Sequence, residues 1–248
     1  METETTPENS TRFVAAFETF GNICALNVLW LICCIPVFTI GASTTALYSV
    51  MLKLINKEEG PIARSFFRAF KENFKKATIA WLIVVGAIIA ISGELLFAYV
   101  YDFKGFMASF YFILGIIELI ILCFVLPFLF PLIAKFENSI WNTFKNSFLL
   151  AVSNPGSWVK IFLAWFMPMF ICFAYPAVFV MFWYIWVILL TGLIAFGTSF
   201  TIRKVFNRIE RAQEKKNEID SKKREINDNS DSKSLSLSEK AHMNYVKK

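Results

Sequence analysis

Long apolar runs alternate with short polar segments along most of the chain. Three runs exceed the roughly 20 residues that a helix needs to cross the hydrocarbon core of a bilayer: Ala77–Tyr101, Phe106–Ala134 and Ser157–Ile202. The last run is long enough for two helices. Tyr175-Pro176 divides it into Trp158–Ala174 and Ala177–Ile202, because proline interrupts helical hydrogen bonding. The pattern predicts an all-α membrane protein, a polytopic helical bundle.

The first apolar stretch, from Gly21 onward, is interrupted near its centre. Pro36 lacks a backbone donor and bends or ends a helix, whereas Gly41 tolerates the backbone angles of a turn. Ala42–Ile55 can then return as a second helix. Hydroxyl groups are available for the backbone groups that such a break frees: Thr39, Ser43, Thr44 and Thr45. We predict a sharp hairpin or broken helix, packed inside the bundle.

This hairpin gives about six transmembrane helices, with Asp102–Gly105 as the short turn of the next hairpin and both termini inside the cell. A single kinked span in its place gives five, with the N-terminus outside. Cations gather in the connectors Lys53–Lys76 and Lys135–Lys160 and in the C-terminal tail. The positive-inside rule places all three regions in the cytoplasm. We therefore predict a multi-pass protein of the bacterial plasma membrane with a cytoplasmic C-terminus.

Both ends of the chain are polar. Residues 1–10 are predicted to be disordered, and Thr11–Phe20 to form a short interfacial helix that opens the membrane domain, residues 11–206. Residues 207–248 form a charged cytoplasmic tail. It is expected to be helical while charges of both signs alternate, and disordered after Ile226, where Ser, Asp, Asn and Lys dominate.

Composition and charge exclude an ordinary soluble domain. The 248 residues are 56% hydrophobic and 17% aromatic, with a mean hydropathy of +0.54. Residues 1–202 carry 12 Lys and Arg against 11 Asp and Glu, whereas residues 203–248 carry 13 against 8. The net charge of +6 therefore belongs mostly to the tail, and no nucleic-acid partner is predicted. The seven tryptophans suggest sugar stacking, but several lie near the predicted membrane interfaces, where aromatic belts are expected, and we favour that interpretation.

An internal repeat relates the two connectors. The segment SFFRAFKENF (Ser65–Phe74) matches SIWNTFKNSF (Ser139–Phe148). The spacing places four large apolar side chains on one helical face of each copy: Phe66, Phe67, Phe70 and Phe74, and Ile140, Trp141, Phe144 and Phe148. The opposite face of the first copy carries cations, namely Arg64, Arg68, Lys71 and Lys75.

This pattern predicts two amphipathic interfacial connector helices on the inner leaflet. The cations of the first copy are available to anionic lipid. The second copy lacks most of that charge, so we expect it to be buried more deeply in protein. Both helices can be simple connectors; the more specific hypothesis is that one of them docks on a partner.

Glu94 and Glu118 lie inside long apolar runs. A charged side chain at the centre of a membrane helix costs roughly 2.5–3.5 kcal/mol on insertion scales, so such residues indicate function. If both face the bundle interior, they can bind a cation or relay a proton. The alternative is that each is protonated, or hydrogen-bonded to hydroxyls such as those after Pro36.

Catalysis is not expected. The single histidine, His242, lies in the tail, which excludes a Ser/His or Cys/His pair in the membrane region. No phosphate-binding loop or metal-ligand spacing is present in the sequence, so we predict no enzyme activity, cofactor or metal. The cysteines all lie in apolar runs and are interpreted as small buried hydrophobic residues: Cys24, Cys33, Cys34, Cys123 and Cys172.

The segment from Leu26 to Ile83 resembles a known family. Its characteristic residues are Asn27, Trp30, Pro36, Thr39-Ile40-Gly41-Ala42, Ala46-Leu47-Tyr48, Phe67, Phe70, Lys71 and Asn73-Phe74. They resemble the YesL-like family, a domain of unknown function in bacterial integral membrane proteins. The likeness is strong over about Phe17–Leu82 and diffuse to about Asn207. Family members often occur beside carbohydrate ABC importers, sugar-binding proteins and glycan-degrading enzymes, which implies a role in sugar uptake or its regulation.

Three functional hypotheses follow. The first is a non-catalytic membrane protein that is an accessory or regulatory partner of a carbohydrate ABC importer and contacts its permease or ATPase subunits. The alternative is a small-solute or ion-coupled transporter or channel that uses Glu94 and Glu118. The third is a lipid-binding membrane organiser that acts through the cations of the first connector copy. Homo-oligomerisation stays open under each hypothesis.

Overall fold

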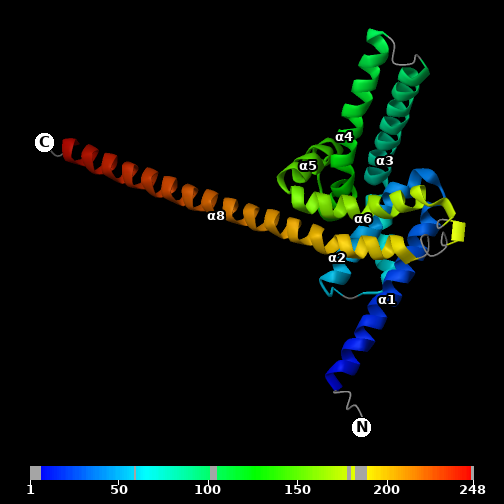
Figure 1. Ribbon diagram of the computed structural model, residues 1–248. Coiled ribbons are helices and arrows are strands. Elements are labelled where there is room, and N and C mark those ends of the chain that lie inside the picture. Colours follow the sequence, from blue (N-terminus) through cyan, green and yellow to red (C-terminus); the bar gives the residue numbers. More distant parts are fainter. Residues whose placement is uncertain (1–6, 59, 101–104, 178–179, 182–188, 247–248) are drawn as a thin grey trace. The chain divides into compact units, whose positions relative to one another are not determined.

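The computed structural model describes residues 7–58, 60–100, 105–177, 180–181 and 189–246. Every regular element among them is a helix, which confirms the all-α prediction (Figure 1). The elements are α1 (Pro7–Cys34), the 3-10 helix η1 (Val37–Thr39), α2 (Ile40–Ile55), α3 (Ile62–Val100), α4 (Phe106–Lys135), α5 (Ile140–Ser153), α6 (Pro155–Ala174) and α8 (Thr191–Val246). The chain divides into two compact units, Met1–Arg203 and Lys204–Lys248.

The first two helices fold back on each other at Pro36, which confirms the predicted hairpin. The indole nitrogen of Trp30 on α1 donates a hydrogen bond to Thr44 Oγ1 on α2 at 3.2 Å, a contact that requires the chain to reverse between them. At the break, Thr39 Oγ1 donates to the carbonyl oxygens of Pro36 and Cys33. The Thr39 hydroxyl therefore bonds backbone groups at the break, as expected. The other three hydroxyls are not seen to do so: Thr44 accepts from Trp30, and the Ser43 and Thr45 oxygens have no hydrogen-bond partner among the described residues.

Helix α2 lies at the centre of the larger unit. Of its span, 61% is buried inside the protein, against 17–22% for the spans of α1, α3 and α4. Helix α2 contacts all three of these helices. Leu47 and Met51 on α2 are fully buried and belong to the same core cluster as Leu26 of α1 and Phe66 of α3. The motif that follows Pro36 is thus part of the protein interior.

Helices α3 and α4 form a second antiparallel hairpin (Figure 1). At one end the ring centroids of Phe97 and Tyr111 are 5.1 Å apart, and toward the other end those of Trp81 and Phe130 are 6.2 Å apart. The predicted turn falls on residues 101–104, outside the described residues. The hairpin brings the two long apolar runs of the sequence into direct contact.

Four helices among the described residues are long and apolar enough to cross a membrane: Phe13–Cys34, Val37–Ile55, Ile62–Val100 and Phe106–Lys135. They support a membrane protein. Helix α6 ends at Ala174, where the sequence predicts a break. Residues 178–179 and 182–188 of the last predicted span lie outside the described part, so the count of six stays a prediction.

The first connector is not a separate interfacial helix, contrary to the prediction. Its repeat copy, Ser65–Phe74, is the first part of α3 and continues into the apolar run. The residues that join the two, Lys75, Lys76 and Ala77, are good helix formers, so no local signal ends the helix. Thr11–Phe20 is likewise part of α1, which begins at Pro7, within the segment predicted to be disordered.

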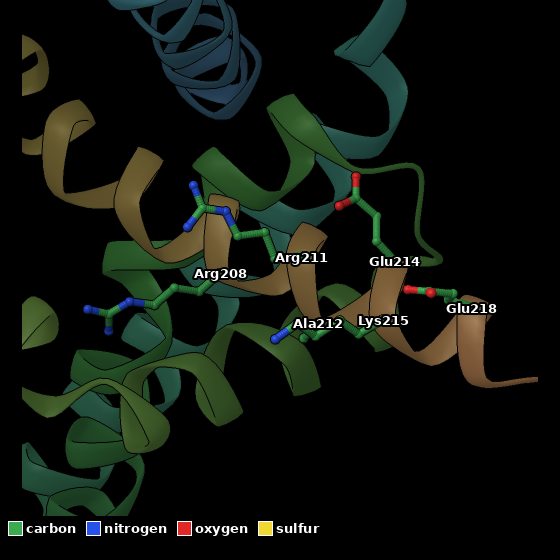
Figure 2. Close-up of a pocket in the computed structure, with 6 residues that line it drawn as sticks. All are labelled: Arg208, Arg211, Ala212, Glu214, Lys215 and Glu218. Atoms are coloured by element: carbon green, nitrogen blue, oxygen red, sulfur yellow. The ribbon is translucent and has the colours of Figure 1, made fainter.

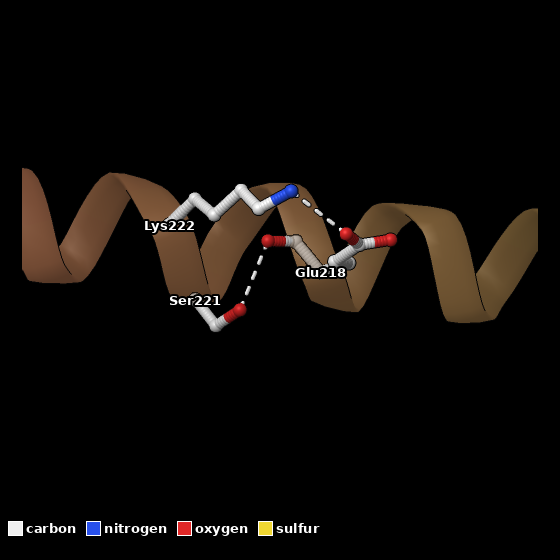
Figure 3. A network of polar contacts seen from close by, with 3 residues as sticks. All are labelled: Glu218, Ser221 and Lys222. Atoms are coloured by element: carbon white, nitrogen blue, oxygen red, sulfur yellow. Dashed lines mark hydrogen bonds and ion pairs between the residues drawn. The ribbon is translucent and has the colours of Figure 1, made fainter.

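The tail is helical beyond the predicted point. Helix α8 continues to Val246, whereas the composition predicts disorder after Ile226. No proline or glycine occurs between Lys204 and Val246 to interrupt it. Pairs one turn apart support the helix: Lys222 Nζ lies 2.7 Å from Glu218 Oε1, and Ser221 Oγ donates to the Glu218 carbonyl at 2.9 Å (Figure 3).

The tail helix presents charges of both signs on a shallow surface. A hollow of about 440 Å³ is lined by Arg208, Arg211, Ala212, Glu214, Lys215 and Glu218, all from α8 (Figure 2). Every residue from Arg211 to Arg224 is exposed. This surface has the features of a solvated charged helix.

Candidate functional site

Buried polar side chains link α2, α6 and the first turns of α8. The indole nitrogen of Trp165 donates to the Tyr48 hydroxyl at 3.2 Å, and that hydroxyl lies 3.4 Å from Thr198 Oγ1. Thr198 Oγ1 donates in turn to the Ile194 carbonyl at 2.8 Å. Since the Thr198 proton is used there, Tyr48 is the donor to Thr198. Tyr48 is therefore both acceptor and donor in one continuous chain of hydrogen bonds.

Further polar residues lie in the same interior. Asn27, Ser43, Thr45 and Ser199 are fully buried. Gly192 of α8 packs directly on α1, because a Cβ added at this glycine would lie 3.1 Å from Asn27 Cβ and 3.2 Å from Ile23 Cγ2. Small residues permit such close helix packing in membranes, where polar groups also join helices. We call the hydrogen-bonded residues Tyr48, Trp165 and Thr198 the polar cluster.

Gly41 allows α2 to approach α3. A Cβ at this position would lie 2.5 Å from the Ala77 carbonyl oxygen and 2.6 Å from Trp81 Cβ. The Trp81 indole nitrogen donates to the Val37 carbonyl oxygen at 2.8 Å and so holds the break against α3. The glycine is required by close packing of two helices, and not by the turn itself, which ends before it.

The structure brings most of the predicted motif together and adds residues that the sequence interpretation missed. Trp81, Trp165 and Thr198 join the break and the polar cluster from distant parts of the chain. The indole N–H groups of Trp81 and Trp165 bond to other helices of the protein, as those of Trp30 and Trp158 do. A tryptophan in an apolar run carries no signal for a partner that is more than 40 residues away.

Glu94 on α3 and Glu118 on α4 meet across the second hairpin. Glu118 follows Gly115 by three residues, so it lies on the same side of α4 as this glycine. Glu94 Oε2 lies over Gly115 of α4, 3.3 Å from where a Cβ of this glycine would be. This oxygen is buried and has no hydrogen-bond partner among the described residues. No hydrogen bond in this part of the structure joins either carboxylate to the hydroxyls after Pro36, so that alternative is not observed.

The first repeat copy turns one phenylalanine inward. Phe66 is fully buried, and Phe70 and Phe74 follow it in a row of ring contacts, with centroids 6.3 Å and 5.4 Å apart. Phe67 is 51% exposed. The four cations predicted on the outer face are all exposed, namely Arg64, Arg68, Lys71 and Lys75. The amphipathic character is present, on a helix that is anchored in the core.

The second copy is no more buried than the first, contrary to the prediction that it lies deeper in protein: each copy has two buried residues, Phe66 and Ala69 in the first and Thr143 and Ser147 in the second. Helix α5 turns small residues inward, namely Thr143, Ser147 and Ala151. Its large apolar residues are exposed, with Trp141 at 78% and Phe148 at 39%, and Phe144 is half-buried. The small side chains let α5 lie close against α4, and Phe148 contacts Phe124 of α4 at a ring centroid distance of 6.0 Å, whereas Trp141 faces outward.

Together these features define a class of protein: a helical protein with several apolar helices of membrane length around a buried polar cluster. Residues 23–94 match the family model "Protein of unknown function, DUF624". The chain is 28% identical over 135 residues to "Uncharacterized protein YesL" of Bacillus subtilis (strain 168). No solved structure matches the chain. These matches confirm the resemblance to the YesL-like DUF624 family.

The match covers part of each protein. It spans 53% of this chain and 62% of YesL, which is less than two thirds of that relative. The family model covers α1 from Ile23, all of α2 and most of α3. It therefore contains the hairpin, Gly41 and Tyr48, and it ends at Glu94. Glu118 and α5 lie outside the region that the family model matches.

The hydrogen-bond chain through Tyr48 makes a stability prediction. Tyr48→Phe removes the acceptor of the Trp165 N–H and the donor to Thr198, and we expect it to destabilise the protein by about 1 kcal/mol, as is typical of hydrogen bonds between membrane helices. Thermal unfolding of the purified full chain in detergent measures this. Tyr99→Phe is the matched control, because Tyr99 is 73% exposed. Equal midpoints for the two variants would contradict the assigned role of Tyr48.

Proposed function

We propose that the protein is a non-catalytic accessory or regulatory partner of a carbohydrate ABC importer in the bacterial plasma membrane, with its C-terminus in the cytoplasm. The resemblance to the YesL-like family supports this, because it implies a role in sugar uptake or its regulation. The four membrane-length helices support a membrane location, and the basic connectors support the orientation. The permease or the ATPase subunits are the expected partners.

The observation that carries this proposal is the outward face of α5. Trp141, Leu149 and Val152 are exposed by 78%, 57% and 52%, while the opposite face of the helix packs on α4. The adjoining Lys145 and Asn142 are exposed too. An exposed tryptophan among aliphatic and polar neighbours is typical of the anchoring residues of protein interfaces. This face is the proposed docking surface for the importer.

Co-purification from the native host tests the proposal. The tagged full chain, extracted in mild detergent, is expected to recover ABC permease or ATPase subunits in stoichiometric amounts by mass spectrometry. Trp141→Ala should lower that recovery at least about tenfold, because truncating an interface tryptophan costs on the order of 2 kcal/mol or more. Phe106→Ala is the control, since Phe106 is 82% exposed on another helix. Recovery of the protein alone would reject the accessory role.

A second candidate function rests on the carboxylate pair. Glu94 and Glu118 lie on facing sides of a hairpin of two long apolar helices, and Glu94 Oε2 is buried without a hydrogen-bond partner among the described residues. Ionisable groups in this setting mark ion and proton pathways in membrane proteins. We propose as the alternative that the protein moves a small solute or ion itself, with these two residues on the path.

Reconstitution separates the two functions. If the protein is a proton-coupled transporter or a channel, full-length protein in liposomes should pass protons, read with an entrapped pH-sensitive dye. Glu94→Gln and Glu118→Gln should each reduce the flux to background, because neither amide carries the proton. Glu137→Gln is the control, since Glu137 is exposed beyond the end of α4. An accessory protein gives no flux, and both variants still recover the importer.

A further inference from the structure

A groove of about 810 Å³ runs along α1 in the larger unit. Its walls are α1 from Ala15 to Leu29, the end of α2 with the connector to α3, and Phe196 and Phe200 of α8. The stretch of α1 measures about 21 Å from the helical rise per residue. The volume falls in the range of pockets for organic ligands. The hypotheses above do not use this groove.

The groove is polar at one end and apolar at the other. Because α1 and α2 are antiparallel, Glu18 of α1 lies at the same end as Lys53 and Lys57, which stand at the end of α2 and in the connector. Toward the other end the walls are formed by Ala25, Leu29, Val50 and Phe196. A ligand that fills the groove therefore has a charged head and an apolar body.

Charges of both signs line the polar end. Lys53 and Lys57 are balanced by Glu18 and Glu58. None of these four forms an ion pair with another of them, as far as the chain is described. Glu58 accepts a hydrogen bond only at long range, 3.4 Å from Asn56 Nδ2. The cations and the carboxylates are thus available to a ligand that carries both charges.

Arg203 holds this end of the groove in place. Its guanidinium donates to the Ile55 carbonyl at 3.0 Å and to Asn56 Oδ1 at 3.3 Å. It also lies 5.8 Å from the ring centroid of Phe200, a wall residue. The connector that carries Lys57 and Glu58 is therefore hydrogen-bonded to α8, which holds it in position.

We propose that the groove binds one phospholipid whose zwitterionic headgroup ends in a primary ammonium, the phosphatidylethanolamine class. Lys53 and Lys57 contact the phosphate, and Glu18 and Glu58 accept hydrogen bonds from the ammonium. An acyl chain lies along Leu29, Val50 and Phe196. The two carboxylates disfavour a headgroup with net negative charge, and a quaternary ammonium has no N–H to donate to them. The proposed lipid site uses Lys53, Lys57, Glu18 and Glu58. It is separate from the exposed cations of the first repeat copy.

Native mass spectrometry of the detergent-purified full chain tests the site, with dioleoyl phosphatidylethanolamine, phosphatidylcholine and phosphatidylglycerol titrated in turn. Phosphatidylethanolamine should bind tightest. The double variant Lys53→Gln with Lys57→Gln should bind it at least about tenfold more weakly, given the usual contribution of a cation at a lipid headgroup. Arg68→Gln with Lys71→Gln is the matched control and should bind as the wild type does.

Two further variants separate the head from the body of the groove. Ala25→Trp places a large side chain in the apolar part and should abolish binding, with circular dichroism confirming the fold. Glu18→Gln with Glu58→Gln should remove the preference for phosphatidylethanolamine over phosphatidylcholine. Equal binding of the three lipids, an unchanged affinity in the lysine variant, or an equal loss in its control would overturn the proposal. So would lipid binding that persists in folded Ala25→Trp protein.

Discussion

Replacing Phe66 by alanine is expected to destabilise the larger unit by about 3 kcal/mol, the lower end of the range for buried phenylalanines. Phe66 is fully buried in the cluster that α1, α2 and α3 share. Its ring also contacts those of Phe67 and Phe70, at centroid distances of 5.7 Å and 6.3 Å. A bilayer weakens the hydrophobic term, but the lost packing contacts and the remaining cavity keep their cost.

The neighbouring residue supplies the control. Phe67 has the same side chain and the same helix, yet it is 51% exposed. Phe67→Ala should therefore change stability by no more than about 1 kcal/mol. Unfolding midpoints followed by circular dichroism in one detergent give both values. Equal losses for the two variants would show that the repeat copy lies flat on a surface, as the sequence pattern predicts, and is not anchored in the core.

Gly41→Ala is expected to separate α2 from α3 and to cost about 1–3 kcal/mol, as overpacking of a close contact usually does. The new Cβ would lie 2.5 Å from the Ala77 carbonyl oxygen and 2.6 Å from Trp81 Cβ. These are a backbone atom and the first side-chain atom of a helical residue, which cannot move without moving α3. The hydrogen bond from Trp81 to Val37 should weaken with the displacement.

Gly86→Ala is the comparison variant, and we expect its effect on stability to have the opposite sign. Gly86 lies within α3 and would place its Cβ in open space, with no atom within 4 Å. Alanine there should stabilise the helix by up to about 1 kcal/mol, because it is the better helix former. The midpoint should therefore fall for Gly41→Ala and rise for Gly86→Ala. A rise for both would contradict the close approach of α2 and α3.

Both experiments concern the segment that matches the DUF624 model, residues 23–94. Within this segment the motif residues have distinct structural roles. Thr39 satisfies the carbonyls at the break, Gly41 permits close packing and Tyr48 links α2 to α6 and α8. A loss of importer recovery in a Gly41 variant would therefore be ambiguous. Trp141→Ala, on the exposed face of α5, tests docking without disturbing this core.

The amino-acid sequence by itself determined the features that depend on local composition. Apolar runs of membrane length predict the helices. Pro36 predicts the end of α1, because it lacks a backbone N–H and is followed within ten residues by Gly41 and four hydroxyl side chains; proline alone is not sufficient, since Pro127 and Pro131 lie inside α4. The hydroxyl of Thr39 is close enough in sequence for its role at the break to be predicted too. The pairing of Ser65–Phe74 with Ser139–Phe148 is likewise a property of the sequence.

Only the tertiary structure decided which of these surfaces face inward. The two repeat copies share a pattern, but Phe66 is buried and Trp141 is exposed, because the first copy continues into a core helix while the second packs through its small residues. The meetings of Tyr48 with Trp165, and of Glu94 with Glu118, join residues from separate helices. In an apolar helix every face can be buried, so the sequence pattern does not indicate which face points into the protein. Contacts with neighbouring helices determine that orientation.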